Sequence, residues 1–490
     1  MKKQFVLNMV LLFVINLLVK PFYVFSVETD VQNLLGTQTF GMYFYHLNFV
    51  FLFQFIGDFG LQTWNHQFIS KNREKINFIL PNVMATKTLL SLMWLTCVLA
   101  FSWFISDLAS DMLFLITLNV ILSTLFILIR SFISGLGYYT TDSLLSALDK
   151  LLMIVVLSYL MYFGVTEEPF TLNDFIYGQM FSLILANGVA LVILLQHLPS
   201  WGISGIIKYF QWHSLWDTLQ KCAPYALILF LMMSYNKLDG FLLGFLQEDN
   251  GKQAGIYAAS YRIYDAANMF LYMVPALVLP MFSNMYSLGN EVKSLVDMVV
   301  RWLMVITGPV LILSVFYAEE IIQLLYIEHV DEKVISFQFL MFSFLLVSFG
   351  YIFGALALAG DKVNKLVPVF FTGLLVNFLL NVFLIPKYGA KGAAISTTIT
   401  QFWVLVGQVF IIRKYLFIAI NRVDLGKGIV FMTLIFVFAR IITWIWPEST
   451  FITFVSSAIF SVPLAFLLKL ADLNDVRMVF NKKNNNNQIE

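Results

Sequence analysis

Apolar runs of about 20 residues, separated by short polar breaks, follow one another along almost the whole chain. A helix of that length crosses the hydrocarbon core of a bilayer, which is about 30 Å thick. Hydrophobic residues make up 60% of the chain and charged residues only 12%, whereas soluble domains carry about 25% charged residues. Such a chain cannot cover a water-exposed surface, so we expect an all-α protein that crosses a membrane many times.

The polar breaks predict about fourteen spans, of which the first two cover 5–25 and 40–62. With the N-terminus inside, lysine and arginine gather at the inner ends of these spans. The residues at the outer ends are only Lys252, Lys333, Lys387 and Lys391. Positive residues mark the cytoplasmic side, and one missed helix would invert the pattern after it. The distribution therefore predicts that both termini are cytoplasmic.

The sequence contains an internal echo. The segment Phe40-Gly41-Met42-Tyr43 resembles the segment Ala254-Gly255-Ile256-Tyr257, which lies 214 positions later, and each segment begins a long apolar run. Repetition at about half the chain length indicates two similar halves, as in many transporter folds. We expect 197–220, a segment with three tryptophans, to lie along the inner interface and to join these halves.

Motifs for nucleotide, metal and covalent chemistry are missing from the sequence. It has no Walker A motif, no H-E-x-x-H and no G-x-S-x-G, and its five histidines show no metal-ligand spacing. Cys97 and Cys222 lie in or beside apolar runs, so we expect packed thiols and no disulfide. The sequence thus predicts no cofactor, no metal site and no ATP-driven transport by this chain alone.

Charged residues inside the predicted spans carry the functional signal, because each costs about 2.5–3.5 kcal/mol near the centre of a membrane helix. Lys237 and Asp239 lie near the middle of the span 221–246. Residues two apart on a helix do not face each other, so each of them needs another helix or water. Arg262 and Asp265 are three apart on the next helix, so they either pair locally or line a cavity.

Three further charges lie closer to the predicted helix ends. Lys20 is expected in the outer third of the first helix, beside a kink at Pro21. Lys87 is expected to extend its side chain to the inner interface. Asp58 is expected at the inner end of the second helix, as an interfacial or capping carboxylate.

These charges define the candidate site. The predicted substrate-binding residues are Lys20, Lys237 and Arg262. Cations suit an anionic group such as a pyrophosphate, and the planar guanidinium of arginine can donate two parallel hydrogen bonds to it. The carboxylates either carry a coupling proton or balance these cations, and the sequence leaves both roles open. They are Asp239, Asp265 and Asp58.

Short motifs along nearly the whole chain carry a family resemblance. They are Phe40-Gly41-Met42-Tyr43, Asp58-Phe59-Gly60-Leu61, Lys237-Leu238-Asp239, Gly255-Ile256-Tyr257 with Tyr261-Arg262, and Leu384-Ile385-Pro386-Lys387-Tyr388-Gly389 followed by Gly392-Ala393-Ala394-Ile395. With them the chain resembles polysaccharide-export flippases of the O-antigen type, in the multidrug/oligosaccharidyl-lipid/polysaccharide superfamily.

That resemblance implies two six-helix lobes around a central cavity, with two helices appended at the C-terminal end. The lobes would be 1–196 and 221–412, with the linker 197–220 between them, the appended helices at 413–470 and a polar cytoplasmic tail at 471–490. The chain would be a transporter and not an enzyme. It would move an undecaprenyl-pyrophosphate-linked oligosaccharide repeat unit across the bacterial inner membrane by alternating access, for O-antigen (lipopolysaccharide) or capsule biosynthesis.

The implied partners are the lipid-linked oligosaccharide, a coupling proton or Na⁺, the bilayer, and polysaccharide polymerase or assembly proteins, with no nucleic acid. Two alternatives stay open. A cation-coupled exporter of multiple drugs or small amphiphiles would favour about twelve helices. An integral-membrane glycan polymerase or ligase would be expected to carry a sizeable outer loop.

Overall fold

In the computed structural model of the chain, the residues described are 18–105, 108–163, 169–197 and 212–472. This part of the chain is helical and contains no strand. Ten of its helices are long and apolar enough to cross a bilayer. The prediction of an all-α, multi-pass membrane protein is therefore confirmed, while the exact number of fourteen spans stays a prediction.

The described residues fall into two compact units. The first contains Met1–Arg262 and Phe378–Ala393, and the second contains Ile263–Asn377 and Ala394–Glu490. The elements of the first unit are η1 (Tyr23–Glu28), α2 (Thr29–Leu35), α3 (Thr37–Leu52), α4 (Gln54–Asp58), α5 (Leu61–Lys71), η2 (Arg73–Lys75), α6 (Ile76–Ser102), α7 (Ser110–Gly135), α8 (Tyr139–Tyr162), α9 (Leu172–Gln196), α11 (Trp212–Leu246) and the start of α12 (Lys252–Leu271).

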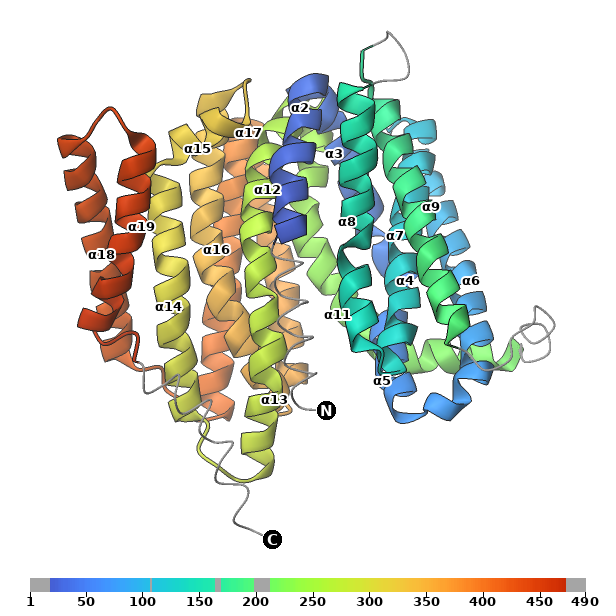
Figure 1. The fold of residues 1–490 in the computed structure, drawn as a ribbon. Coiled ribbons are helices and arrows are strands. Elements are labelled where there is room, and N and C mark those ends of the chain that lie inside the picture. The colour runs from blue at the N-terminus through green and yellow to red at the C-terminus, as the bar shows by residue number, and fades with distance from the viewer. Residues whose placement is uncertain (1–17, 106–107, 164–168, 198–211, 473–490) are drawn as a thin grey trace. The chain divides into compact units, whose positions relative to one another are not determined.

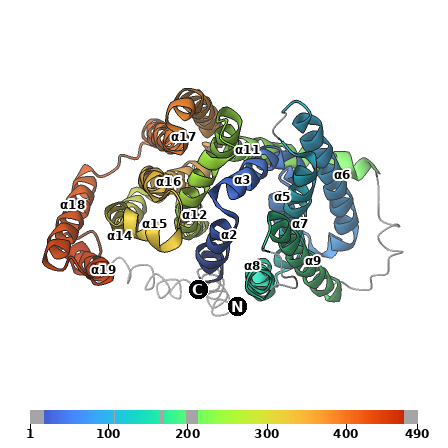
Figure 2. The same cartoon turned by 90° about the horizontal axis from the view of Figure 1, so that it is seen from above.

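Within the first unit, α7 packs against α6, α8 and α9, and α3 packs along α11. Figures 1 and 2 show α6, α7, α8 and α9 side by side and nearly parallel. An apolar core joins α5, α6, α7, α9 and α11, and it includes the buried thiol of Cys222. Cys97 and Cys222 are both free, as expected.

The second unit is built from long helices around α14 and α16. Its elements are α13 (Met273–Ser287), α14 (Lys293–Phe316), α15 (Ala318–Leu325), α16 (Val330–Ala359), α18 (Arg422–Ile445) and α19 (Thr450–Leu467). Within it, α14 packs against α16, α18 and α19, and an apolar cluster around Tyr317 and Phe431 joins α14 to α18 and α19.

The helix α17 (Val363–Tyr415) belongs partly to each unit. Its 53 residues are interrupted by non-helical backbone at Gly389, where φ is 53° and ψ is −132°. Two side chains hold this stretch within the first unit: Gln247 donates to the carbonyl of Ile385, and the Gln253 carboxamide accepts from the amide of Ala390 at 2.7 Å. The sequence predicted two spans here, 364–385 and 391–412, and the interruption lies between them.

The first helix is displaced from its prediction. Its described part runs from Leu18 through a π-helical turn after Pro21 to Leu35, and not to residue 25. The sequence placed its end too early because Thr29 and Gln32 are polar. Both are buried against protein, at 3% and 1% exposure, and do not form a loop in water. Lys20 therefore lies roughly 22 Å from the end of the helix, at a rise of about 1.5 Å per residue, and not in its outer third.

The second predicted span is broken. After α4, Phe59 and Gly60 adopt left-handed backbone with φ of 44° and 76°, and α5 starts a new helix at Leu61. Of the predicted linker, residues 198–211 lie outside the described residues, and 212–220 form the start of α11. Residues 473–490 of the predicted tail lie outside them as well. The lobe boundaries stay a prediction.

Candidate functional site

Arg262 is buried on α12, and its charge is satisfied within the first unit. Its Nε lies 3.1 Å from a carboxylate oxygen of Glu28, and its Nη1 donates to the Glu28 carbonyl at 3.4 Å. The guanidinium also stacks on the ring of Phe40, 3.9 Å from the ring centroid. A planar guanidinium held by a carboxylate and an aromatic face is the arrangement that arginine adopts when it is removed from water. Glu28 is the carboxylate that the structure places against Arg262.

Lys237 and Asp239 both turn to other helices, as the two-residue spacing requires. The ammonium of Lys237 lies 5.1 Å from the ring centroids of Phe51 on α3 and Tyr261 on α12. The carboxylate of Asp239 is 1% exposed. It accepts hydrogen bonds from the hydroxyl of Tyr257, at 3.2 Å, and from the carboxamide of Asn381 on α17.

The aromatic side chains of α3 connect these groups. The ring of Phe44 lies 6.2 Å from that of Tyr261 and 6.4 Å from that of Tyr257, while Phe40 lies under Arg262. Lys237, Asp239 and Arg262 thus share one aromatic wall formed by α3, α11 and α12. This wall combines two cations, a buried carboxylate and polarisable ring faces.

The two tyrosines of the echo occupy equivalent places. Tyr43 and Tyr257 are both buried, at 5% and 1% exposure. Tyr43 donates to the side-chain oxygen of Gln179 at 3.2 Å, and Tyr257 donates to Asp239 at the same distance. Each echo segment therefore directs a phenol to a polar side chain on a neighbouring long helix.

Lys20 belongs to a different group of charges. Its ammonium is close enough to Asp149, Lys150 and Arg130 to interact electrostatically with all three. Arg130 pairs with Asp142 at 2.8 Å, and the ammonium of Lys150 lies 4.7 Å from the ring centroid of Tyr23. The group is rich in cations, but its members come from the helical turn before η1, from α7 and from α8, and not from the wall that holds Lys237.

Asp58 and Lys87 are both buried near the break between α4 and α5. Lys87 is 2% exposed and donates to the carbonyl of Gly57 at 2.7 Å and to the hydroxyl of Thr124 at 2.9 Å. Its ammonium thus caps the end of α4, where the helix leaves carbonyl groups without partners. The prediction that Lys87 extends to the interface is wrong, because the carbonyl at this break binds the ammonium inside the protein. Asp58, at 8% exposure, lies near this ammonium, and its place at the interface stays a prediction.

Asp265 lies on α12 beyond Arg262, in the second unit. The structure thus brings Lys237, Asp239 and Arg262 together, and places Lys20 and Asp58 in two other groups of the first unit. Sequence reasoning missed Glu28 and Asn381. The uninterrupted helix from Pro21 to Gly36 could have revealed Glu28 as a residue within the membrane, whereas nothing in the sequence connects Asn381 with Asp239.

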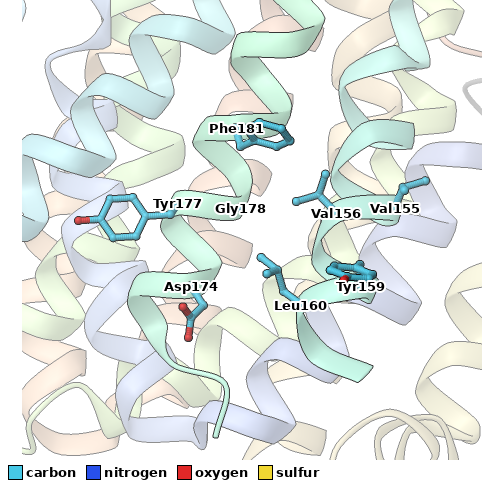
Figure 3. A pocket seen from close by; sticks show the side chains of 8 residues that line it. All are labelled: Val155, Val156, Tyr159, Leu160, Asp174, Tyr177, Gly178 and Phe181. Atoms are coloured by element: carbon cyan, nitrogen blue, oxygen red, sulfur yellow. The ribbon is translucent and has the colours of Figure 1, made fainter. Parts of the chain in front are cut away.

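A groove of about 450 Å³ lies between α8 and α9 (Figure 3). Val155, Leu160 and Phe181 contribute to its mostly apolar lining, with Tyr159 and Asp174 beside them. Asp174 caps the start of α9 through reciprocal hydrogen bonds with Thr171. None of the predicted site residues lines this groove, and several of its side chains are exposed.

The fold matches those of solved membrane transporters. The structure matches that of the lipid II flippase MurJ in an inward closed conformation, with a TM-score of 0.69 and 12% identity, over 94% of this chain and 98% of that one. It also matches an inward-facing multidrug resistance MATE transporter, with a TM-score of 0.60 and 15% identity, over 79% and 93%.

The chain belongs to the family of polysaccharide biosynthesis proteins, whose sequence model it matches over residues 6–286. It is 27% identical over 150 residues to an uncharacterized membrane protein of Methanocaldococcus jannaschii, covering 30% of this chain and 29% of that protein. It is 30% identical over 103 residues to the capsular polysaccharide biosynthesis protein CapF of Staphylococcus aureus, covering 21% and 26%. The matched stretch therefore spans less than a third of either relative. The family prediction is confirmed, and the narrower O-antigen type stays a prediction.

Proposed function

We propose that this chain is a flippase for an undecaprenyl-pyrophosphate-linked oligosaccharide repeat unit, acting by alternating access in the bacterial inner membrane. It would serve a surface polysaccharide such as O-antigen or capsule, with both termini in the cytoplasm. The observation that carries the proposal is the likeness in fold to a lipid II flippase, which extends over 94% of this chain and 98% of that one. Membership of the polysaccharide biosynthesis family supports the same substrate class.

The chemistry of the aromatic wall fits an anionic lipid headgroup. Lys237 and Arg262 supply positive charge within helices of the membrane region, where charge interactions are strong because water is scarce. Arginine and lysine both bind phosphate, arginine through two parallel hydrogen bonds. The pyrophosphate would bind these two cations while the polyprenyl chain stays in lipid. Lys20, in its separate group of charges, stays a predicted substrate contact outside this wall.

Asp239 is the carboxylate best placed to take a coupling ion. It is buried, it is negatively charged when ionised, and the Asn381 carboxamide and Tyr257 hydroxyl already orient its oxygens. A proton or Na⁺ bound there would change the charge of the wall that carries Lys237. Such a change offers a way to couple ion binding to the affinity for an anionic substrate.

The test is a strain that lacks this protein, in which undecaprenyl-linked oligosaccharide in the membrane and polysaccharide at the cell surface are both quantified. We expect lipid-linked units to accumulate and surface glycan to be lost, with recovery on return of the wild-type gene. Return of Asp239→Asn at normal abundance is expected to leave the block in place. Normal amounts of both glycans in the deletion strain would reject the flippase.

A second candidate is a cation-coupled exporter of multiple drugs or small amphiphiles. The fold likeness to a multidrug resistance transporter, over 79% of this chain, favours it. In that case the deletion strain would keep its glycans and become more susceptible to amphiphilic drugs. The two measurements on one strain therefore separate the candidates.

A further inference from the structure

The start and the end of α17 lie together in the second unit. An apolar cluster that includes Leu366 and Ile411, with Tyr415 packed against it, joins the first turn of α17 to its last turns. A Cβ on Gly360, just before α17, would lie 2.6 Å from a methyl carbon of Leu416, just after it. Both ends were predicted to face the cytoplasm because they are basic. The cations of these ends and of the first residue of α18 are Lys362, Lys365, Arg413, Lys414 and Arg422.

Two lysines from opposite ends of α17 share one aromatic ring. The ammoniums of Lys365 and Lys414 each lie 5.4 Å from the ring centroid of Tyr415, within the range of about 6 Å over which a ring attracts a cation. Both lysines are exposed, so a ligand can reach them. The helix dipole favours Lys414, in the last turn of α17, but opposes Lys365, in its first turn. Two like charges near one ring repel each other, and an anion between them would reverse that effect.

The carboxylates of this region do not neutralise the two lysines. Among the residues that the structure describes, neither lysine forms an ion pair. Asp361, in the connection before α17, is exposed and forms no ion pair within that same part of the chain. Asp424, in the first turn of α18, already contacts Arg301 at 3.6 Å and accepts from the Asn421 carboxamide at 3.0 Å. The surface around the Tyr415 ring therefore keeps a surplus of positive charge that suits an anionic ligand.

Exposed aromatic side chains flank these lysines. Phe410 is 59% exposed, and the Lys414 ammonium lies 5.4 Å from its ring centroid. Phe417 is 88% exposed, and its φ of 56° is left-handed, which is rare for a bulky residue. It lies in the connection between α17 and α18, where residues 417–421 have no regular secondary structure (Figure 2). Cations beside exposed aromatic rings are typical of surfaces that bind an anionic lipid headgroup together with its apolar chains.

We propose that the two ends of α17 form a binding site for an anionic phospholipid of the predicted cytoplasmic leaflet, such as phosphatidylglycerol. The phosphate binds between the ammoniums of Lys365 and Lys414, and an acyl chain packs against Phe410. Phe417 enters the headgroup region beside it. The bound phosphate thus links the connection before α17 to the one after it. The ligand is a lipid of the surrounding bilayer and not the transported molecule, so the inference does not rest on the proposed transport function.

The first test asks whether the purified full-length protein prefers an anionic lipid. The protein in detergent is titrated with dioctanoyl-phosphatidylglycerol, and the midpoint of thermal unfolding is followed, because a ligand that binds the folded state raises it. We expect a saturable rise, from which an apparent dissociation constant is obtained. Dioctanoyl-phosphatidylcholine, which has the same chains but no net charge, is expected to raise the midpoint far less. Equal rises with the two lipids would overturn the site.

Charge variants then locate the site. Lys365→Gln is expected to weaken the binding of phosphatidylglycerol at least about tenfold, the usual effect of losing one contact between a charged group and a phosphate. Lys365→Arg keeps the charge and is expected to retain binding. The matched control is Lys387→Gln, which removes the same charge from an exposed position of the same helix, far along the chain from both ends. Equal weakening by Lys365→Gln and Lys387→Gln would reduce the effect to net charge and reject the site.

A headgroup without chains separates a lipid from a free phosphate. Glycerol phosphate is expected to bind at least about tenfold more weakly than phosphatidylglycerol, since it buries no apolar surface. Equal affinities would show that the site takes any phosphate, and would overturn the lipid assignment. Phe417→Asn is expected to fold, because asparagine tolerates left-handed backbone, and to narrow the difference between the two ligands. Binding needs no transport, so a deletion strain with normal glycans would reject the flippase and leave the lipid site standing.

Discussion

The two units handle buried charge differently. Among the described residues, the first unit buries Lys87, Asp239 and Arg262 in the interiors of α6, α11 and α12, besides Asp58 at the end of α4. The buried charges of the second unit are Lys333 and Asp424, which lie in the first turns of α16 and α18. Charge near a helix end lies close to water and headgroups, whereas charge in a helix interior must be satisfied by protein.

The interior of the second unit uses neutral groups instead. Ser343 and Thr398 share a hydrogen bond of 2.9 Å between α16 and α17, and Tyr317 and Thr443 share one of 3.2 Å. Hydrogen bonds between hydroxyl groups of neighbouring membrane helices add modest stability and place no net charge in hydrocarbon. The comparison shows that the first unit keeps charges in helix interiors, where protein groups surround them, while hydroxyl groups join the helices of the second unit.

The largest effect on stability is expected from Lys87→Met. Methionine fills a similar volume, but it leaves the buried Gly57 carbonyl without its donor and the Asp58 carboxylate without a nearby cation. A buried polar group left without a partner costs about 1–3 kcal/mol, and more if it is charged. Thermal unfolding in detergent measures the loss. The double variant Lys87→Met/Asp58→Asn is expected to recover part of it. A loss below about 1 kcal/mol would show that this interior charge is dispensable for folding.

Lys237→Ala is expected to act on transport and not on abundance. Its ammonium lies over two aromatic rings, and losing one contact between a charged group and a phosphate costs about 1.5–3 kcal/mol, which corresponds to about 10–150-fold. Quantifying lipid-linked oligosaccharide in the complemented deletion strain measures this loss. Lys237→Arg is the matched control that keeps the charge. Full activity of the alanine variant would remove Lys237 from the site.

The smallest effect is expected from Arg301→Gln in the second unit. Arg301, with 22% of its side chain exposed, pairs with Asp424 at 3.6 Å, and the Asn421 carboxamide also donates to Asp424 at 3.0 Å, so the carboxylate keeps a partner in the variant. The cost should stay below about 1 kcal/mol, with transport near the wild-type level. Unfolding and glycan measurements on this variant alongside Lys87→Met compare the two units directly. Equal losses of stability in both variants would contradict the distinction drawn between them.

The sequence alone was sufficient to predict those features that depend on the average environment of a helix. Apolar runs, sparse charge and the echo predicted a helical multi-pass membrane protein with related segments, and short motifs predicted its family. These features were readable because hydrocarbon selects apolar side chains along a whole helix, whatever that helix touches. The same rule placed the end of the first helix too early. In the sequence, a polar residue that is buried against protein, such as Gln32, cannot be told from one that is exposed to water.

Tertiary structure alone decided the partners of each charge. Arg262 and Glu28 are 234 positions apart, and Asp239 and Asn381 are 142 apart. The periodicity of apolar residues along one helix does not indicate which distant helix will pack against it. The sequence identified the residues that carry charge into the membrane, since their transfer from water is costly wherever they lie. Only the packing of α3, α11, α12 and α17 determined which of them meet, because hydrogen bonds and ion pairs act over a few ångströms.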